Sequence, residues 1–188
     1  MSSILITTSR RPSNRVRTFV RDIQSIIPDS LRFNRGGMSL PEIVSRIQQS
    51  NTRAAFIISS YKGNPGNLQV IESNGVIVYE LVLESALLRR ETRKEDRTRI
   101  SYLSTVSVHQ DSSTNTKEFG SYLAALLDVD FSEIKEISDM QSDLAGRTSI
   151  FLQDYDSKVL WTVYHTLDLS EIGPRIRISH IRRFPNEQ

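Results

Sequence analysis

The chain has 188 residues and a mass of 21.5 kDa, which suits one compact domain or two small halves that share a core. Apolar residues make up 38% of it and charged residues 24%, a composition that excludes intrinsic disorder. The chain has no cysteine, which excludes disulfides, thiolate catalysis and cysteine-ligated metals and favours a cytoplasmic location. No apolar run is long enough to span a membrane, and the first residues have the reverse charge order of a signal peptide.

The net charge of +2 conceals a segregation of charge along the chain. Residues 101–171 have twelve acidic and four basic side chains, a balance of −8, so the rest of the chain carries +10. Of the 24 basic residues nineteen are arginine, whose planar guanidinium can hold a phosphate through two hydrogen bonds. Genome composition or growth at high temperature could also enrich arginine. The segregation favours a polyanion-binding surface, and we expect the basic side chains outside 101–171 to form one continuous face.

The first part of the chain predicts a strand, two helices and then three strands, with one brief strand between the helices. The first helix begins near Ser13, has one apolar face and ends at Pro28. The second begins at a capping box formed by Ser39 and Glu42. The expected strands cover residues 3–8, 31–34, 54–61, 68–72 and 76–83. Asn74 and Gly75 indicate a hairpin between the last two.

The second part repeats this order after a highly charged stretch at 86–99. A helix is expected over about 116–127, and a further helix is expected to start with Asp130 and Glu133 as caps and to end at Gly146. The expected strands cover residues 100–108, 148–154, 158–166 and 175–182. The two parts share this order of elements, which suggests an α/β fold of two similar halves, each a small mixed sheet with helices, although no repeat is visible residue by residue. As a single domain over 1–188 it divides into an N-terminal half (about 1–85), a basic connector (about 86–99) and a C-terminal half (about 100–188).

A search for catalytic chemistry finds no recognisable constellation. The three histidines, His109, His165 and His180, have neither metal-ligand spacing nor a serine nucleophile motif beside them. We therefore predict no catalytic residues, no metal, no cofactor and no small-molecule substrate. A nuclease or other hydrolase is the least favoured class.

The strongest local pattern is an arginine cluster between the first strand and the first helix. Hydroxyl side chains and four arginines lie together in residues 7–17. Helix N-termini bind anions and disfavour cations, so arginines here oppose local stability, as expected of a binding site. The four arginines are Arg10, Arg11, Arg15 and Arg17.

A second candidate is the segment Gly63-Asn-Pro-Gly66, preceded by Lys62. It matches the Gly-x-x-Gly loop of the KH RNA-binding module, although that loop joins two helices and this one is predicted to join two strands. A plain type II turn at Pro65-Gly66 accounts for it equally well. In a binding interpretation, Lys62 would place a positive charge beside exposed backbone amides.

Four ordered motifs resemble the Brix-domain family of ribosome biogenesis factors. The first is Ile-Thr-Thr-Ser-Arg-Arg-Pro-Ser-x-Arg-x-Arg-x-Phe-x-x-Asp over 6–22. The others are Arg35-Gly36 followed by Glu42-Ile43, the segment 62–66, and Glu-Ile-Gly-Pro-Arg-Ile-Arg-Ile over 171–178. The resemblance covers almost the whole chain and is nearest to the stand-alone archaeal form, because the long charged extensions of many eukaryotic relatives are missing.

This resemblance implies a non-enzymatic RNA-binding factor that acts on pre-ribosomal RNA during rRNA processing and subunit assembly. It also implies that each half is similar to the anticodon-binding domain of class IIa aminoacyl-tRNA synthetases. The alternative is a protein-interaction scaffold whose acidic second half docks ribosomal proteins or assembly partners. No membrane partner is expected. The predicted RNA-binding residues are Arg10, Arg11, Arg15, Arg17, Arg35, Lys62, Gly63, Asn64, Arg175, Arg177, Arg182 and Arg183.

Overall fold

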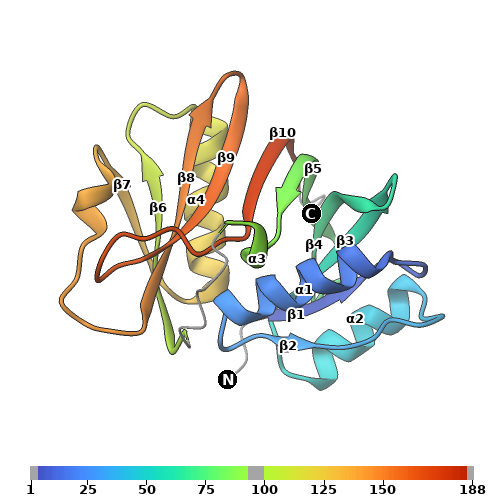
Figure 1. The fold of residues 1–188 in the computed structure, drawn as a ribbon. Coiled ribbons are helices and arrows are strands. Elements are labelled where there is room, and N and C mark those ends of the chain that lie inside the picture. Colours follow the sequence, from blue (N-terminus) through green and yellow to red (C-terminus); the bar gives the residue numbers. More distant parts are fainter. Residues whose placement is uncertain (1–3, 93–99, 186–188) are drawn as a thin grey trace.

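A computed structural model describes residues 4–92 and 100–185. Within these residues the chain forms one mixed sheet of ten strands with helices on both faces (Figure 1). The strand order is β2-β1-β3-β4-β5-β10-β9-β8-β6-β7. The order reads alike from either edge, because β5 and β10 pair antiparallel at the middle and corresponding strands follow outward on each side.

In the N-terminal half, β1 lies between two parallel neighbours, β2 and β3, and antiparallel hairpins lead on to β4 and β5. The strands are β1 (Ile4–Thr8), β2 (Leu31–Arg32), β3 (Ala54–Tyr61), β4 (Asn64–Glu72) and β5 (Ile77–Leu87). The helices are α1 (Asn14–Ile26), α2 (Leu40–Gln49) and the short α3 (Arg89–Thr92).

The C-terminal half repeats this pairing: β6 lies between its parallel neighbours β7 and β8, and β9 and β10 follow as antiparallel strands. The strands are β6 (Tyr102–His109), β7 (Asp130–Ile134), β8 (Arg147–Tyr155), β9 (Lys158–His165) and β10 (Arg175–Arg183). The helices are α4 (Thr114–Leu127) and the 3₁₀ turn η1 (Ile137–Met140).

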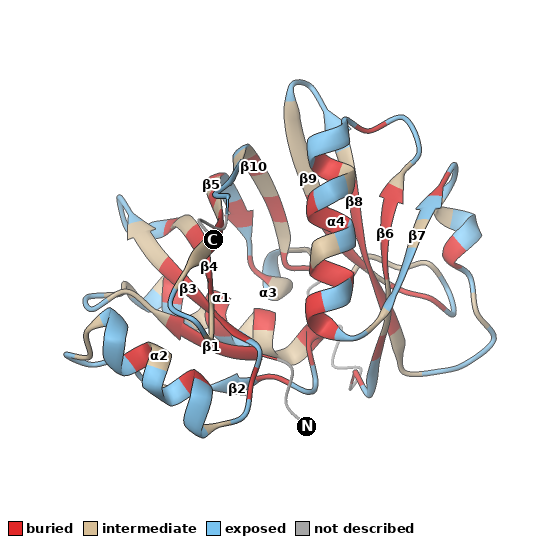
Figure 2. Cartoon of the chain, turned by 180° about the vertical axis from the view of Figure 1, so that it is seen from behind, coloured by how far each residue is buried: buried red, intermediate tan, exposed pale blue. Residues whose placement is uncertain are grey.

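The two faces of the sheet are covered unevenly. The main core packs α1 and α4 against one face, and Figure 2 shows buried positions along both helices where they meet the strands. Alternate residues of β3 and β8 point to the other face, which α2 covers at Ala55 and Ile57 and η1 covers at Phe151. This alternation is the period of two that half-buried strands require.

Helix α1 follows the sequence expectation closely. Its N-cap is Ser13, whose hydroxyl accepts a hydrogen bond from the N–H of Val16. This bond satisfies one of the free amides at the helix start. The apolar positions spaced three and four apart are all buried: Val16, Phe19, Val20, Ile23, Ile26 and Ile27. The buried stripe fixes which side of α1 faces the sheet and leaves its arginines on the rim or outside.

The prediction of a helix over 130–146 is wrong. Residues Asp130–Ile134 form the edge strand β7, in which Ser132 and Ile134 point inward while Phe131 and Glu133 are exposed. A helical turn follows only at η1, where the Asp139 carboxylate accepts the backbone N–H groups of Lys135 and Glu136. The apolar residues were too sparse to distinguish a period of 3.6 from one of two.

Two smaller expectations also need correction. The turn between β3 and β4 is at Lys62-Gly63, where both residues have positive φ (47° and 82°), and Pro65-Gly66 belongs to β4 rather than to a type II turn. Strand β5 continues to Leu87, into the stretch expected to be a connector. The connector's Arg93, Lys94, Arg97 and Arg99 lie outside the described residues.

Candidate nucleic-acid interface

The arginine cluster lies at the carboxyl ends of β1 and β2, beside the start of α1. The chain leaves β1 through α1 to reach β2 on one side, and returns through α2 to β3 on the other. The strand order therefore reverses at β1. Open α/β sheets bind ligands in the crevice at such a switch point, where the ends of parallel strands diverge.

A pocket of about 430 Å³ occupies this crevice. Five arginines contributed by four segments of the chain line it, together with the polar residues Thr8, Ser9 and Asn34. Among the described residues that line the pocket none is acidic. The arginines are Arg10, Arg17, Arg21, Arg32 and Arg35. We call this site the arginine pocket.

Within the described residues, none of the five arginines of the arginine pocket forms an ion pair with a carboxylate. Arg35 is half-buried and its Nε donates to the carbonyl of Met38 at 2.9 Å. Burial, and the charge of neighbouring Arg10, lower the pKa of the Arg35 guanidinium. Glu42 is near Arg10, but its carboxylate is held by the N–H and hydroxyl of Ser39, and these hydrogen bonds are the main cause of its lowered pKa. Guanidinium groups held together in this way favour a bound anion.

The hairpin of the second sequence candidate adjoins the same helix start. The Ser13 hydroxyl donates to the carbonyl of Gly63 at 2.6 Å, and the Ser13 N–H donates to the hydroxyl of Ser60 at 3.2 Å. Lys62, Gly63 and Asn64 therefore lie beside the segment that supplies Arg10 and Arg17. The structure brings these two predicted parts of the interface together.

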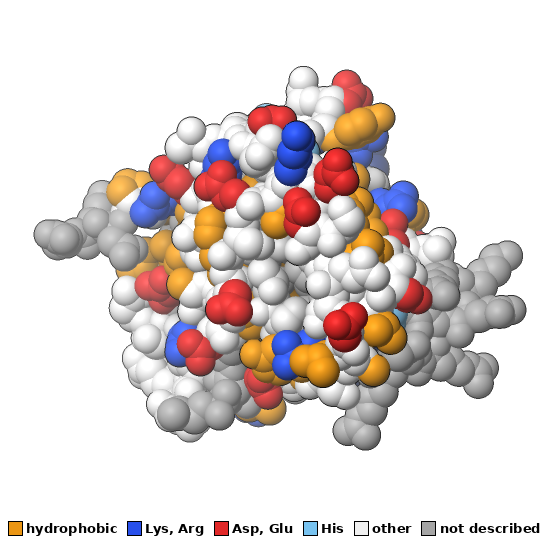
Figure 3. Space-filling view, turned by 90° about the vertical axis from the view of Figure 1, so that its left-hand side faces the viewer, with side chains coloured by type: hydrophobic (Ala, Val, Ile, Leu, Met, Phe, Trp, Pro, Cys, Tyr) orange, Lys and Arg blue, Asp and Glu red, His pale blue; other side chains and the backbone are white. Residues whose placement is uncertain are grey.

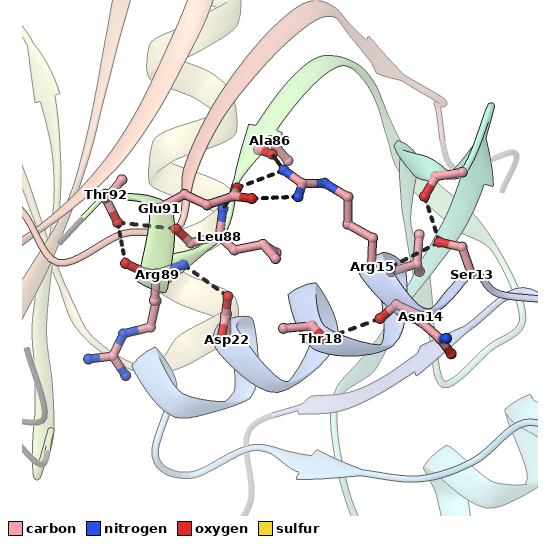
Figure 4. A network of polar contacts seen from close by, with 12 residues as sticks. Ser13, Asn14, Arg15, Thr18, Asp22, Ala86, Leu88, Arg89, Glu91 and Thr92 are labelled. Atoms are coloured by element: carbon pink, nitrogen blue, oxygen red, sulfur yellow. Dashed lines mark hydrogen bonds and ion pairs between the residues drawn. The ribbon is translucent and has the colours of Figure 1, made fainter. Parts of the chain in front are cut away.

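Arg15 has a different role from its neighbours. Its guanidinium forms two hydrogen bonds with Glu91, at 2.6 and 2.7 Å, and a third with the carbonyl of Ala86 at 3.0 Å (Figure 4). The Glu91 carboxylate also accepts the N–H of Leu88. Arg15 thus ties α1 to the end of β5 and to α3, and it is not part of the lining of the arginine pocket.

The four predicted arginines of β10 lie apart from the arginine pocket, and each is paired with a carboxylate. The ion pairs are Arg175 with Glu171, Arg177 with Glu84 and Asp156, Arg182 with Glu80, and Arg183 with Glu118. This arrangement differs from the continuous positive face expected from the sequence. β10 pairs with β5 and β9 at the middle of the sheet. β5 supplies Glu80 and Glu84, the turn between β8 and β9 supplies Asp156, and α4 supplies Glu118.

Two lining residues, Arg21 and Arg32, were not among the predicted site residues. Arg21 follows Arg17 by four residues on α1, a spacing that places both on one side of a helix. Arg32 occupies the last position of β2, opposite Ile6. The helical spacing was a usable signal in the sequence, whereas the position of Arg32 depends on the parallel pairing of two strands. Arg11, by contrast, is exposed and does not line the arginine pocket.

The corresponding place in the C-terminal half has opposite charge. Ser113 caps α4 as Ser13 caps α1, and its N–H donates to the carboxylate of Asp154 at 2.8 Å. Asp154 precedes the last residue of β8, as Ser60 precedes the last residue of β3. The start of α4 is thus in contact with a carboxylate, while the start of α1 is in contact with the neutral hydroxyl of Ser60 and lies beside the arginine pocket.

The side of the molecule beyond β7 is acidic in character. Figure 3 views the molecule from that side and shows Asp and Glu side chains spread over it, with fewer Lys and Arg. In the part of the chain that the structure describes, no group of three or more His, Asp or Glu side chains is placed to hold a metal. Nor is any helix there long and apolar enough to cross a membrane. The absence of an enzymatic site stays a prediction.

The structure is that of a mixed α/β protein with a pocket lined by five arginines, and comparison of whole structures gives the same architecture. A probable ribosomal biogenesis protein from Aeropyrum pernix is similar with a TM-score of 0.73 and 25% identity, over 98% of this chain and 97% of that one. An archaeal Imp4-like protein shares the fold with a TM-score of 0.63 at 19% identity.

Sequence comparison finds relatives from archaea that are named for the Brix domain, which confirms the resemblance to that family. A probable Brix domain-containing ribosomal biogenesis protein of Sulfurisphaera tokodaii is 32% identical over 91 residues, 48% of this chain and 52% of that protein. The one from Pyrococcus horikoshii is 36% identical over 92 residues, 47% and 41% of the two chains. A U3 small nucleolar ribonucleoprotein protein, IMP4 of Saccharomyces cerevisiae, is 33% identical over 67 residues, 36% and 23%.

These alignments cover about half or less of the curated relatives. No protein-family model matches the chain. The archaeal relatives reported above are named as probable ribosomal biogenesis proteins.

Proposed function

We propose that this protein is a non-enzymatic factor of ribosome biogenesis that binds precursor ribosomal RNA through the arginine pocket. The observation that carries the proposal is the set of five arginines around one pocket that has no acidic lining residue among those described. RNA presents a phosphate at every nucleotide, and bidentate guanidinium contacts are well suited to it. The names of the relatives support a role in ribosome biogenesis.

Fluorescence anisotropy with a labelled single-stranded RNA tests the proposal. If the five arginines each neutralise one phosphate, log K should fall with log salt at a slope of about −3.5. The triple variant Arg10→Ala/Arg17→Ala/Arg32→Ala should lower affinity at least about tenfold and reduce the slope to about −1.4. All three side chains are exposed, so the fold should be retained.

A charge-matched control separates the arginine pocket from the overall charge. The variant Arg177→Ala/Arg182→Ala/Arg183→Ala removes the same three charges from β10, where each arginine already has a carboxylate partner. The RNA affinity of this variant should stay within about threefold of wild type, because the three substitutions leave the arginine pocket unchanged. Equal losses in the two triple variants would refute the proposal of a localised site and restore the broader surface expected from the sequence.

A second function has support from the acidic side of the molecule. The face drawn in Figure 3 combines acidic side chains with the edge of β7, which suits docking of a basic protein such as a ribosomal protein or an assembly partner. Binding of a Lys-rich peptide that survives the triple variant of the arginine pocket would support it.

We also infer that the two halves are structural repeats. The mirrored strand order, the serine caps of α1 and α4 and the matching hairpins after β3 and β8 support this inference. The likeness of each half to the anticodon-binding domain of class IIa aminoacyl-tRNA synthetases remains a prediction. A cytoplasmic location is part of the proposal, with the absence of cysteine as its support.

A further inference from the structure

An exposed aromatic side chain lies near the arginine pocket. Tyr61 is the last residue of β3 and 65% of its surface is exposed. The ammonium group of Lys62 lies 5.4 Å from the centre of the ring. An exposed aromatic ring with a cation beside it can accept a nucleic-acid base on its face while the cation meets the phosphate.

The backbone of the hairpin sets the position of this ring. Tyr61 pairs directly with Asn64 across the two-residue turn. Gly66 lies so close behind it that a Cβ atom there would be 2.3 Å from the Cβ of Tyr61. Glycine at this position therefore allows the hairpin to close on the tyrosine, although the ring itself packs into no core.

The same hairpin is fastened to the start of α1. The Gly63 carbonyl accepts the Ser13 hydroxyl at 2.6 Å, and Pro12, the residue before Ser13, lines the arginine pocket. The hairpin is therefore close to the arginine pocket. An RNA strand with phosphates bound in the arginine pocket would reach the hairpin within a few nucleotides, and a base of that strand could then contact Tyr61.

We propose that Tyr61 is a stacking platform for an unpaired RNA base and that the arginine pocket therefore selects single-stranded or looped RNA over duplex RNA. This inference rests on the proposed function and deepens it by naming the class of RNA. Bases in a duplex already stack on one another and have no free face to offer, whereas unpaired bases can be splayed out and stacked on aromatic rings. Lys62 would hold the phosphate next to the stacked base.

The chain supplies a matched control at the equivalent place in the C-terminal half. Tyr155 ends β8, pairs with Lys158 across a two-residue turn and is 63% exposed, nearly the same as Tyr61. It is followed by Asp156 where Tyr61 is followed by Lys62, and Asp154 precedes it where Ser60 precedes Tyr61. Three basic side chains line a pocket with Tyr155, but each of them has a carboxylate partner: Lys158 pairs with Glu84, Arg175 with Glu171, and Arg177 with Glu84 and Asp156. Because these charges are paired, Tyr155 should not contact RNA.

Two RNA probes and four variants test the inference. The probes are a labelled oligouridine of about 12 nucleotides, which has little structure of its own, and a labelled RNA duplex of the same length. Tyr61→Ala should weaken oligouridine binding by about 5- to 100-fold and leave duplex affinity and the melting temperature unchanged. Tyr61→Phe should bind as wild type, because the ring and not the hydroxyl makes the contact, and Tyr155→Ala should bind both probes as wild type.

A tryptophan at position 61 gives a direct readout of stacking. Fluorescence of the Tyr61→Trp variant should be quenched by oligouridine and not by the duplex, while Trp161, which is fully buried, contributes a constant background. Oligouridine affinity unchanged in Tyr61→Ala, or equal losses for both probes, would overturn the role of Tyr61 and leave the arginine pocket standing. If wild type bound neither probe, the proposed function itself would fail, and the inference with it.

Discussion

Replacing Arg15 by alanine should destabilise the fold and leave RNA binding almost unchanged. Arg15 neighbours Arg17 on α1, but only Arg17 lines the arginine pocket. The Arg15 guanidinium makes three hydrogen bonds, two with Glu91 and one with the Ala86 carbonyl. The two charged side chains are 30% and 31% exposed, so water screens the pair in part.

The size of the effect follows from these contacts. A fully exposed ion pair contributes about 0–1 kcal/mol, and a hydrogen bond to a charged group about 1.5–3 kcal/mol. Since the site is two-thirds covered, we expect Arg15→Ala to lower the free energy of unfolding by about 2 kcal/mol. For a chain of this length that corresponds to a fall of about 4–8 °C in melting temperature.

The effect should depend on pH in a defined direction. The hydrogen bonds from Arg15 are the main cause of the lowered pKa of Glu91 in the folded protein. A carboxyl with a depressed folded-state pKa contributes stability above its unfolded pKa, about 4.3, and loses it as pH falls through the folded value. The difference between wild type and Arg15→Ala should therefore be full at pH 7 and shrink below about pH 4.

Urea denaturation at several pH values, with RNA titrations on the same samples, measures both effects. Arg17→Ala is the control: it should unfold at the wild-type urea concentration and bind RNA more weakly. If Arg15→Ala were as stable as wild type but had lost RNA affinity, the contact with Glu91 would be incidental and Arg15 would belong to the RNA site, as the sequence suggested.

Three further predictions concern single contacts. Ser60→Asp places a carboxylate beside the Ser13 N–H, as Asp154 does beside the Ser113 N–H in the other half. The variant should bind RNA about tenfold more weakly without loss of stability. If Ser60→Asn lost as much affinity, charge would not be the cause. Tyr122→Phe removes the hydroxyl that donates to Glu72 at 3.0 Å across the halves, and should lower the free energy of unfolding by about 1–2 kcal/mol, measured by urea titration; a neutral effect would show that water satisfies Glu72. Gly120→Ala would put a Cβ atom 2.4 Å from Val108 Cγ2 and should cost about 1–3 kcal/mol, seen as a lower melting temperature; an unchanged value would mean that β6 gives way freely.

The sequence predicted most local elements because their signals are local. The apolar stripe and serine cap of α1, the capping box of α2 and the glycine turn at Asn74-Gly75 each act within a few residues. The wrong prediction of a helix over 130–146 has the same origin, because the signal that decides this segment is not local. β7 is a strand because β6 offers it a partner, and pairing with a strand more than twenty residues away leaves no local mark in so short a segment.

The candidate site divides in the same way. The arginines at the start of the first helix are visible in the sequence, and helical spacing relates Arg17 to Arg21. Which of these arginines share a pocket depends on the tertiary structure. The parallel pairing of β1 with β2 brings Arg32 and Arg35 close to Arg10. Arg15 instead forms hydrogen bonds with Glu91 of α3 and with the Ala86 carbonyl at the end of β5, and so lies outside the arginine pocket. Charge counts add up along a chain, but a binding site depends on which charges remain unpaired, and pairing is set by contacts between residues distant in sequence.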